Sequence, residues 1–250
     1  MTRSRTQMSA QRKTRSAQRK TCETESNAVS DPRRSASRPL EPEASDPVAC
    51  SPHPSRETPM QCLYEPGFLA RPAADELFAR LLRSSDWEQL RLRIFGREVP
   101  APRLSAWYGD PGATYAYSGV VHEPRPWPAY LAGLREQLCA RLGVRFNSVL
   151  ANLYRDGRDS VGWHSDDERE LGEEPVIASV SLGARRRFQM RLRAEGAEIV
   201  AFELEHGSLF AMWGSTQKRW KHRVPRSARC GAARVNLTFR CILDTNRARS

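Results

Sequence analysis

The sequence predicts an α+β or mainly β fold, an antiparallel sandwich or barrel with helices packed on its outside. Helical patterns come first along the globular part of the chain, and short strand-like runs separated by turn residues follow them. Strands and helices do not alternate as they do in a parallel α/β fold. We therefore expect one antiparallel domain rather than a doubly wound sheet.

A change in composition near residue 60 separates a tail from this domain. Residues 1–59 are rich in Arg, Ser, Thr, Pro and Glu. We expect them to be disordered, because they cannot bury enough apolar surface to offset the entropy of ordering. Their basic start is compatible with a nucleic-acid-binding arm, a nuclear signal, a transit segment or no role. Residues 60–250 are expected to form the folded domain.

Two helices are expected early in the domain. Pro72 suits a first helical turn, and apolar residues recur after it at helical spacing, which predicts a helix over 72–84. A second helix is expected over 127–142, because Gly143 follows it and glycine commonly ends a helix.

Strand signals dominate the rest of the chain. Short runs of β-branched and aromatic residues between turn residues predict these strands. In the first of them, Asn152 and Tyr154 share one face. The runs cover 146–154, 176–183, 186–193, 199–205, 207–213 and 233–242.

The last strand has two unlike faces. Arg234, Asn236, Thr238 and Arg240 share one face, and apolar residues share the other. The polar face either meets water or lines the inside of a barrel, where the arginines could bind a dianionic co-substrate. Residues six apart on a strand are about 20 Å apart. The two arginines are therefore expected to hold opposite ends of an elongated diacid.

The overall composition indicates the kind of binding partner and the cellular compartment to expect. The net charge of +11 favours a polyanion such as nucleic acid, although an arginine-rich proteome gives the same balance. Scattered cysteines without CxxC spacing are typical of reduced thiols. No run approaches the roughly 18 apolar residues of a membrane span, and no hydrophobic signal segment opens the chain. We expect a cytoplasmic protein, or a nuclear one in a eukaryote, that acts as a monomer.

His164 and Asp166 stand two residues apart in the run SVGWHSDDERELG. In an extended segment such residues point to one side, so the imidazole and the carboxylate can meet at one point. An HxD pair with a distant histidine is the facial triad that holds Fe(II). A solvated charged loop has the same composition. The third ligand stays open between His206, before a Gly-Ser turn, and His222, in KRWKHRVP.

The motifs NLY, WHSDDE, a distant histidine and RVNLTFR occur in an order that resembles the AlkB family of Fe(II)- and 2-oxoglutarate-dependent dioxygenases, over roughly residues 88–243. The segment RIFGREVPAPRLSAWYGDPGATYAYSG is similar to the substrate-binding segment of the branch that repairs alkylated bases in duplex DNA. The resemblance implies a double-stranded β-helix (jelly-roll) core with flanking helices and a substrate-binding hairpin lid.

The same resemblance implies an activity and its cofactors. Fe(II), the co-substrate 2-oxoglutarate and O2 would support oxidative removal of N-methyl groups from bases such as 1-methyladenine and 3-methylcytosine, with release of formaldehyde and succinate. His164, Asp166 and His222 match the iron ligands, which leaves His206 as a turn histidine. Residues that match the 2-oxoglutarate site are Asn152, Tyr154 and Arg234 at the distal carboxylate, and Arg240 with Asn236 at the carboxylate beside the keto carbon.

The resemblance also assigns substrate residues. Phe95 matches a hairpin-tip finger that fills the gap left by a flipped base, and its stacking offsets part of the cost of extrusion. Tyr117 matches an aromatic that stacks on that base, and Glu168 matches an acidic residue that reads its amino edge. Trp107 and Tyr108 are further candidates, or aromatics of the core.

Alkylation gives the base a positive charge, which Glu168 or Asp167 can complement. Two other functions fit the same residues: an AlkB-like oxygenase acting on RNA or protein methyl groups, and a non-catalytic nucleic-acid-binding domain. Phe95 and the basic balance favour duplex DNA, and the complete ligand set favours an enzyme. The preferred lesion is left open.

Overall fold

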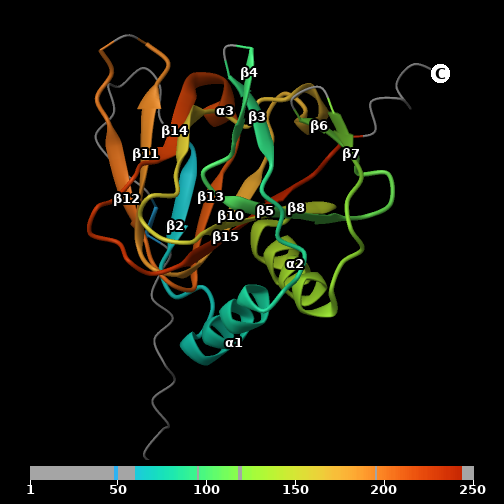
Figure 1. Cartoon of the computed structure of the whole chain (residues 1–250). Helices are drawn as coiled ribbons and strands as arrows, with labels where there is room; N and C mark the ends of the chain where they lie inside the picture. The colour runs from blue at the N-terminus through green and yellow to red at the C-terminus, as the bar shows by residue number, and fades with distance from the viewer. Residues whose placement is uncertain (1–47, 50–59, 95, 118–119, 195, 244–250) are drawn as a thin grey trace, which may run out of the picture. The chain divides into compact units, whose positions relative to one another are not determined.

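The computed structural model describes residues 48–49, 60–94, 96–117, 120–194 and 196–243 (Figure 1). The predicted tail lies outside the described residues except for β1 (Val48–Ala49), which pairs with β2 (Cys62–Glu65). A two-residue strand therefore stands inside the segment for which composition predicts disorder. The boundary at residue 60 stays a prediction.

Two antiparallel sheets form the described domain. In spatial order, the strands of the seven-stranded sheet are β1, β2, β13 (Ser208–Met212), β10 (Ile177–Gly183), β15 (Arg234–Arg240), β8 (Ser148–Tyr154) and β5 (Leu104–Gly109). Those of the four-stranded sheet are β12 (Val200–Leu204), β11 (Arg186–Leu192), β14 (Trp220–Val224) and β9 (Val161–His164).

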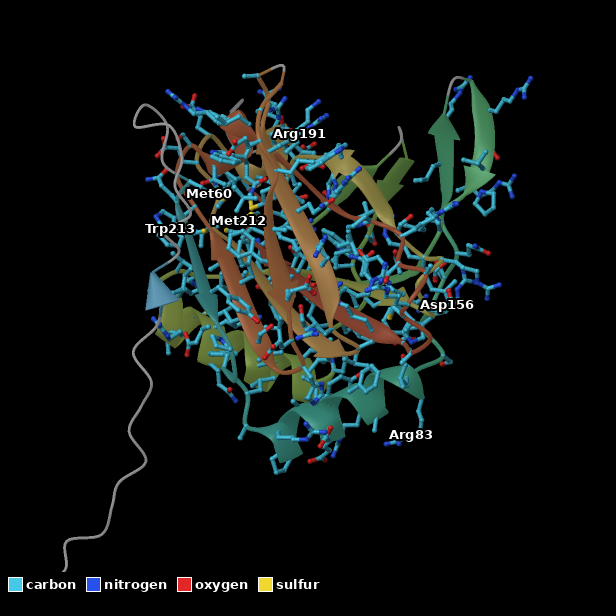
Figure 2. All side chains as sticks on the ribbon, turned by 90° about the vertical axis from the view of Figure 1, so that its left-hand side faces the viewer. Met60, Arg83, Asp156, Arg191, Met212 and Trp213 are labelled. Atoms are coloured by element: carbon cyan, nitrogen blue, oxygen red, sulfur yellow. The ribbon has the colours of Figure 1, made fainter. Side chains whose placement is uncertain are left out.

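Two hairpins and three helices complete the described elements, together with a short 3-10 turn. Hairpin β3–β4 stands apart from the two sheets in Figure 2. No described helix is long and apolar enough to span a membrane. The bounds are β3 (Arg91–Ile94), β4 (Arg97–Pro100), β6 (Tyr115–Tyr117), β7 (Val120–His122), α1 (Arg71–Leu82), α2 (Ala129–Leu142), α3 (Thr216–Arg219) and η1 (Arg169–Leu171).

This architecture confirms the predicted fold: two antiparallel sheets with helices outside, as in a jelly-roll. Both predicted helices and all six predicted strands are present, with ends that differ by one or two residues. Gly143 ends α2 in the left-handed conformation, at a φ of 67°. Strands β2, β5 and β9 and hairpin β6–β7 were not predicted, because their runs are short or interrupted by charge. Hairpin β3–β4 flanks residue 95, where the family resemblance implies a hairpin tip.

α1 and α2 cover one face of the seven-stranded sheet, as Figure 1 shows. One apolar stripe on each helix packs against alternate residues of β8, β10 and β15. Burying a leucine side chain of this kind contributes about 1.5–3 kcal/mol. The buried helical residues are Ala74, Leu77 and Leu81 of α1 and Leu131, Leu134 and Leu138 of α2.

The opposite face of the same sheet packs against the four-stranded sheet. A second apolar cluster fills part of this interface, and Figure 2 shows two of its members, Met60 and Met212, close together. On β15, Val235, Leu237 and Phe239 face the helices. The polar residues between them are buried as well, so the polar face of β15 turns toward the second sheet and not toward water.

Candidate metal and co-substrate site

A cavity of about 70 Å³ lies between the two sheets. β8, β10, β13 and β15 line it from the seven-stranded sheet, and β9, β11 and β14 line it from the four-stranded sheet. The sandwich therefore encloses a mixed polar and apolar chamber. Of the predicted site residues, all those assigned to the metal and to 2-oxoglutarate line it: Asn152, Tyr154, His164, Asp166, His222, Arg234, Asn236 and Arg240.

His164, Asp166 and His222 form a cluster at one end of the cavity. Each offers one ligand atom, and these atoms lie within 4.8 Å of one another. The two histidines are paired across neighbouring strands β9 and β14, and their ring centroids are 4.2 Å apart. Asp166 follows β9 in the chain, so the pairing of β9 with β14 brings the distant histidine to the HxD pair.

The ring nitrogens of the histidines suit metal binding. Nδ1 of His164 donates to the carbonyl of Gly162 at 2.8 Å, because a carbonyl oxygen can only accept. This bond leaves Nε2 with its lone pair. Nδ1 of His222 is buried and has no hydrogen-bond partner among the described residues. Burial, and next the nearby His164, lower the pKa of His222 to about 3, so the imidazole stays in its neutral, ligating form.

Asp166 is held in its charged form. Burial by itself would raise the pKa of this carboxyl, but the adjacent Arg240 guanidinium is the main cause that lowers the pKa below its usual value. Nη2 of Arg240 lies 2.9 Å from Oδ2 of Asp166, and both side chains are almost fully buried. Two imidazoles and one carboxylate that leave other positions open are the donor set of an Fe(II) facial triad. The residues present therefore fit the metal.

The opposite end of the cavity carries a buried positive charge. Arg234 is 1% exposed, and its Nη2 donates to Ser181 Oγ and Asn236 Oδ1, at 2.9 and 2.8 Å. Its Nε and Nη1 make no hydrogen bond with a described residue. Burial lowers the pKa of Arg234 to about 10, while the neighbouring Tyr154 opposes the shift. A buried guanidinium with unused donors fits a carboxylate ligand.

Asn236 and Asn152 organise this end of the cavity. Asn236 accepts from Ser179 and Arg234 and donates to Thr238, each at 2.8 Å. All three partners are protein side chains, so they hold the Asn236 amide in place, and its Oδ1 in turn orients the Arg234 guanidinium. Asn152 lies opposite Asn236 in the β8–β15 pairing. Its Oδ1 accepts from Arg103 Nε at 2.8 Å and from the Ser105 hydroxyl at 3.0 Å.

The two arginines of β15 lie at opposite ends of the cavity. Arg240 lies at the metal end through Asp166. Arg234 lies at the other end, opposite Tyr154 in the strand pairing and 5.3 Å from the centre of its ring. This arrangement agrees with the expectation from strand spacing that the two arginines serve different ends of one molecule.

The substrate candidates are not gathered in the same way. Phe95 lies outside the described residues. Tyr117 ends β6, and its side chain also lies outside the description. Glu168 precedes η1 and is partly buried. Trp107 is partly buried and packs against the second apolar cluster. Tyr108 lies in the helix-side core and donates to Asp86 at 2.7 Å, so its ring is on the face of β5 away from the cavity.

Several other residues of the site were not identified from the sequence. Arg103 lines the cavity and orients Asn152, and Phe188 packs within 5.4 Å of the His222 ring, centre to centre. Ser179 and Thr238 are paired across β10 and β15 and also line the cavity. Thr238 could have been found by its shared face with Arg234. No local signal marks Arg103, because it precedes β5 and reaches the cavity through the packing of that strand on β8.

His206 takes no part in the cluster. Its Nδ1 accepts from the Gly183 amide at 2.8 Å, and its Nε2 lies 3.2 Å from Asp75 of α1. It therefore joins the turn before β13 to a helix, as a turn histidine does, and of the two candidates for the third ligand only His222 reaches the HxD pair.

The fold and this cluster together define a class of protein. Residues 61–240 match the family model of the 2OG-Fe(II) oxygenase superfamily. The fold is similar to that of a solved structure titled "The structure of OsALKBH1", with a TM-score of 0.50 and 18% identity, over 73% of this chain and 99% of that one. At that identity the likeness shows the fold alone.

Within this superfamily the chain belongs to the AlkB family. It is 45% identical over 193 residues to the alpha-ketoglutarate-dependent dioxygenase alkB homolog 3 of Rattus norvegicus, covering 72% of this chain and 63% of the relative. It is 41% identical over 184 residues to the DNA oxidative demethylase ALKBH2 of Mus musculus, covering 70% and 77%. The chain thus spans slightly less than two thirds of the length of its alkB homolog 3 relatives.

Proposed function

We propose that this protein is an Fe(II)- and 2-oxoglutarate-dependent dioxygenase that removes N-methyl groups from alkylated DNA bases such as 1-methyladenine and 3-methylcytosine, releasing formaldehyde and succinate. One observation carries the proposal: the ligand atoms of His164, Asp166 and His222 lie within 4.8 Å of one another in a cavity that also contains a buried arginine with unused donors. If the HxD pair were only part of a solvated charged loop, its side chains would not line a cavity together with a third ligand and a buried arginine.

The metal would be held by His164, Asp166 and His222. When bound, Fe(II) with 2-oxoglutarate and O2 supplies the oxidation that the protein's own side chains cannot perform. The protein's contribution is to keep His222 neutral by burial and Asp166 ionised beside Arg240. Both states favour metal binding at neutral pH without an external base.

The co-substrate 2-oxoglutarate would lie along β15 between Arg240 and Arg234. The unused donors of Arg234 are directed to a carboxylate at the end away from the metal, with Tyr154 and Asn152 on the opposite strand. Asn236 holds Arg234 in place through a hydrogen bond of 2.8 Å. The sandwich excludes bulk water from this end, which strengthens each charge-assisted hydrogen bond.

The substrate would be an alkylated base that is flipped out of DNA. Glu168 or Asp167 would face the positive charge of the base; Asp167 also pairs with Arg193. Phe95 remains the proposed finger, Tyr117 the stacking aromatic, and Trp107 a further contact. The name of the ALKBH2 relative, DNA oxidative demethylase, supports DNA as the polymer, and we propose a duplex.

We propose that the protein acts as a monomer, in the cytoplasm or in the nucleus of a eukaryotic cell, where such DNA occurs.

The test is anaerobic loading with Fe(II) and 2-oxoglutarate, followed by incubation in air with oligonucleotides that carry 1-methyladenine or 3-methylcytosine. Mass spectrometry of the base and assays of succinate and formaldehyde report the reaction. Duplex DNA, single-stranded DNA and RNA of one sequence are compared. His164→Ala is the control for metal-dependent turnover.

Loss of 14 mass units from the base (about one CH2, as in replacement of methyl by hydrogen), in the unmodified protein alone, would support the proposal. Faster reaction of RNA than of DNA would reject DNA as the preferred polymer. Succinate without any change in the base would indicate an oxygenase with another substrate. Absence of both products from iron-loaded protein would overturn the proposed activity.

A further inference from the structure

The main chain of the loop that carries Asp166 is attached to a short helix. α3, residues Thr216–Arg219, lies directly before β14, the strand of His222. Gln217 in this helix is 1% exposed, and its Oε1 accepts the backbone N–H of Asp166 at 3.0 Å. A side chain on the segment of one ligand therefore holds the main chain of another.

The orientation of the Gln217 amide follows from its two neighbours. The backbone N–H of Asp166 can only donate, so the atom that faces it is the oxygen. The nitrogen then faces Sδ of Met212, at 3.4 Å, and sulfur is a weak acceptor. Met212 itself lines the cavity. Gln217 is thus fixed between the Asp166 loop and the cavity wall, and the oxygen and nitrogen of its amide cannot exchange places.

Further bonds link the same loop to the first residue of β14 and, through Arg193, to α3. The hydroxyl of Ser165 donates to the carbonyl of Trp220 at 2.9 Å. Nη2 of Arg193 donates to the Ser165 hydroxyl at 2.8 Å and to the Gln217 carbonyl at 3.3 Å, and also pairs with Asp167. Of these contacts, only the bond from Gln217 reaches the backbone of a residue in the metal cluster.

We propose that Gln217 is a positioning residue that sets the place of the Asp166 carboxylate relative to His222. β9 ends at His164, so the described pairing of β9 with β14 does not include the main chain of Asp166. The buried side-chain amide of Gln217 holds the main chain of Asp166 instead. Gln217 belongs to α3, which directly precedes the strand of His222. The inference rests on the proposed metal site and adds a determinant of its affinity.

The loss of a contact that orients a metal ligand weakens metal binding by a known order of magnitude. Groups that orient metal ligands typically change metal affinity by about 10- to 100-fold when they are removed. Gln217→Met keeps the length of the side chain and removes its acceptor, so we expect metal binding at least about 10-fold weaker. Ser165→Ala is a milder change at a half-buried residue, and we expect a smaller loss in the same direction.

The experiment is an anaerobic titration of the full chain with Co(II) alone, followed by visible absorption, with thermal unfolding measured on each variant. Thr216→Val is the matched control. Thr216 lies on the same helix, is 2% exposed, and bonds to the backbone of Gln61 and not to the metal loop. We expect this variant to unfold at a lower temperature and to bind Co(II) as the unmodified protein does.

Weaker Co(II) binding and an altered absorption band in Gln217→Met, with unchanged binding in Thr216→Val, would support the inference. Equal loss in both variants, or affinity in Gln217→Met within about two-fold of the unmodified protein, would overturn it, because oriented ligands differ by more. If Gln217→Met does not fold, Gln217→Asn, which keeps the amide and shortens the side chain, replaces it: affinity within about two-fold of the unmodified protein overturns the inference, and weaker affinity supports it. Failure of the unmodified chain to bind Co(II) would instead reject the metal site itself.

Discussion

Arg234 and Arg186 show how two equally buried arginines can serve opposite purposes. Arg186 is 2% exposed and donates to the main-chain carbonyls of Asp156, Asp159 and Pro225, at 3.1, 2.8 and 2.8 Å. Arg234 is as deeply buried and keeps two of its three nitrogens without a partner among the described residues. Arg186 therefore ties loops together, whereas Arg234 keeps donors in reserve for a ligand.

We predict that Arg234→Met does not destabilise the ligand-free protein, because replacing a poorly compensated buried charge by an apolar side chain is often neutral or stabilising. The same change should weaken 2-oxoglutarate binding by at least about 30-fold, which corresponds to about 2 kcal/mol for a buried charge contact. Calorimetric titration of the metal-loaded protein and thermal unfolding check the two expectations.

Arg186→Met is the control for this prediction, since it removes hydrogen bonds to three carbonyls and should lower the unfolding temperature. A marked loss of stability in Arg234→Met, with 2-oxoglutarate binding retained, would show that Arg234 is a structural residue and not a ligand-binding one.

Among the connecting elements, the loop after β8 is held by an unusually close approach of two main chains. The amide of Gly157 donates to the carbonyl of Cys230 at 2.7 Å, and the amide of Ser227 donates to the carbonyl of Gly157 at 2.8 Å. A Cβ at position 157 would lie 1.8 Å from the Ser227 carbonyl oxygen. The loop therefore requires glycine for space, and not for a left-handed backbone.

We predict that Gly157→Ala lowers the free energy of unfolding by more than about 3 kcal/mol, because main chain has to move to admit the methyl group. Urea unfolding measures the change. Gly133→Ala is the control of opposite sign: Gly133 is exposed within α2, and a Cβ there meets nothing within 4 Å. Its replacement should stabilise the helix by about 0.5–1 kcal/mol. Equal effects of the two changes would contradict the packing argument.

The same loop contains an ion pair that sets its response to acid. Arg155 donates to Asp159 from its main chain, Nε and Nη2, at 2.9, 2.8 and 2.8 Å. The bonds from the Arg155 side chain lower the pKa of Asp159, against an opposing effect of burial. Because the folded pKa lies below the unfolded value, the pair stabilises the fold above the unfolded pKa and loses its effect as pH falls through the folded one.

We predict that Asp159→Asn lowers the free energy of unfolding at neutral pH by about 1–2 kcal/mol. Below the unfolded pKa of about 3.9, the difference between variant and unmodified protein should shrink. Urea unfolding over a pH series measures both. Arg158→Ala, in the exposed pair with Asp156, is the control and should leave the free energy of unfolding almost unchanged, because solvent screens exposed ion pairs. A difference that does not depend on pH would contradict the assignment to charge.

At the scale of the whole molecule, the site joins the two sheets. His164 and His222 belong to the four-stranded sheet, and Arg234 and Arg240 belong to the seven-stranded sheet. A ligand that contacts both sheets binds the folded state and not the unfolded chain, so it stabilises the sandwich as a unit.

We predict that a divalent metal with 2-oxoglutarate raises the unfolding temperature. At 100 times the dissociation constant the stabilisation is about 2.7 kcal/mol, which corresponds to about 5–10 °C for a domain of this size. Differential scanning fluorimetry without O2 measures the shift. Asp166→Ala removes a predicted ligand and should show almost none of it. A shift of equal size in Asp166→Ala would mean that the ligands bind elsewhere.

The sequence alone determined the features that depend on neighbours in the chain. Helical spacing predicted α1 and α2, and alternation along residues 233–242 predicted both faces of β15. The spacing of His164 and Asp166 marked the HxD pair, and its resemblance to a known family added His222. Each of these patterns spans a few residues, so it survives in the sequence whatever the rest of the chain does.

The tertiary structure decided what depends on strand pairing. The register of β14 on β9 places His222 beside His164 and leaves His206 with Asp75. The packing of β5 on β8 brings Arg103 to Asn152, and α3 brings Gln217 to Asp166. Residues far apart in the sequence meet only when the sheets form, because register follows from burying each strand's apolar face, and no local pattern records that outcome.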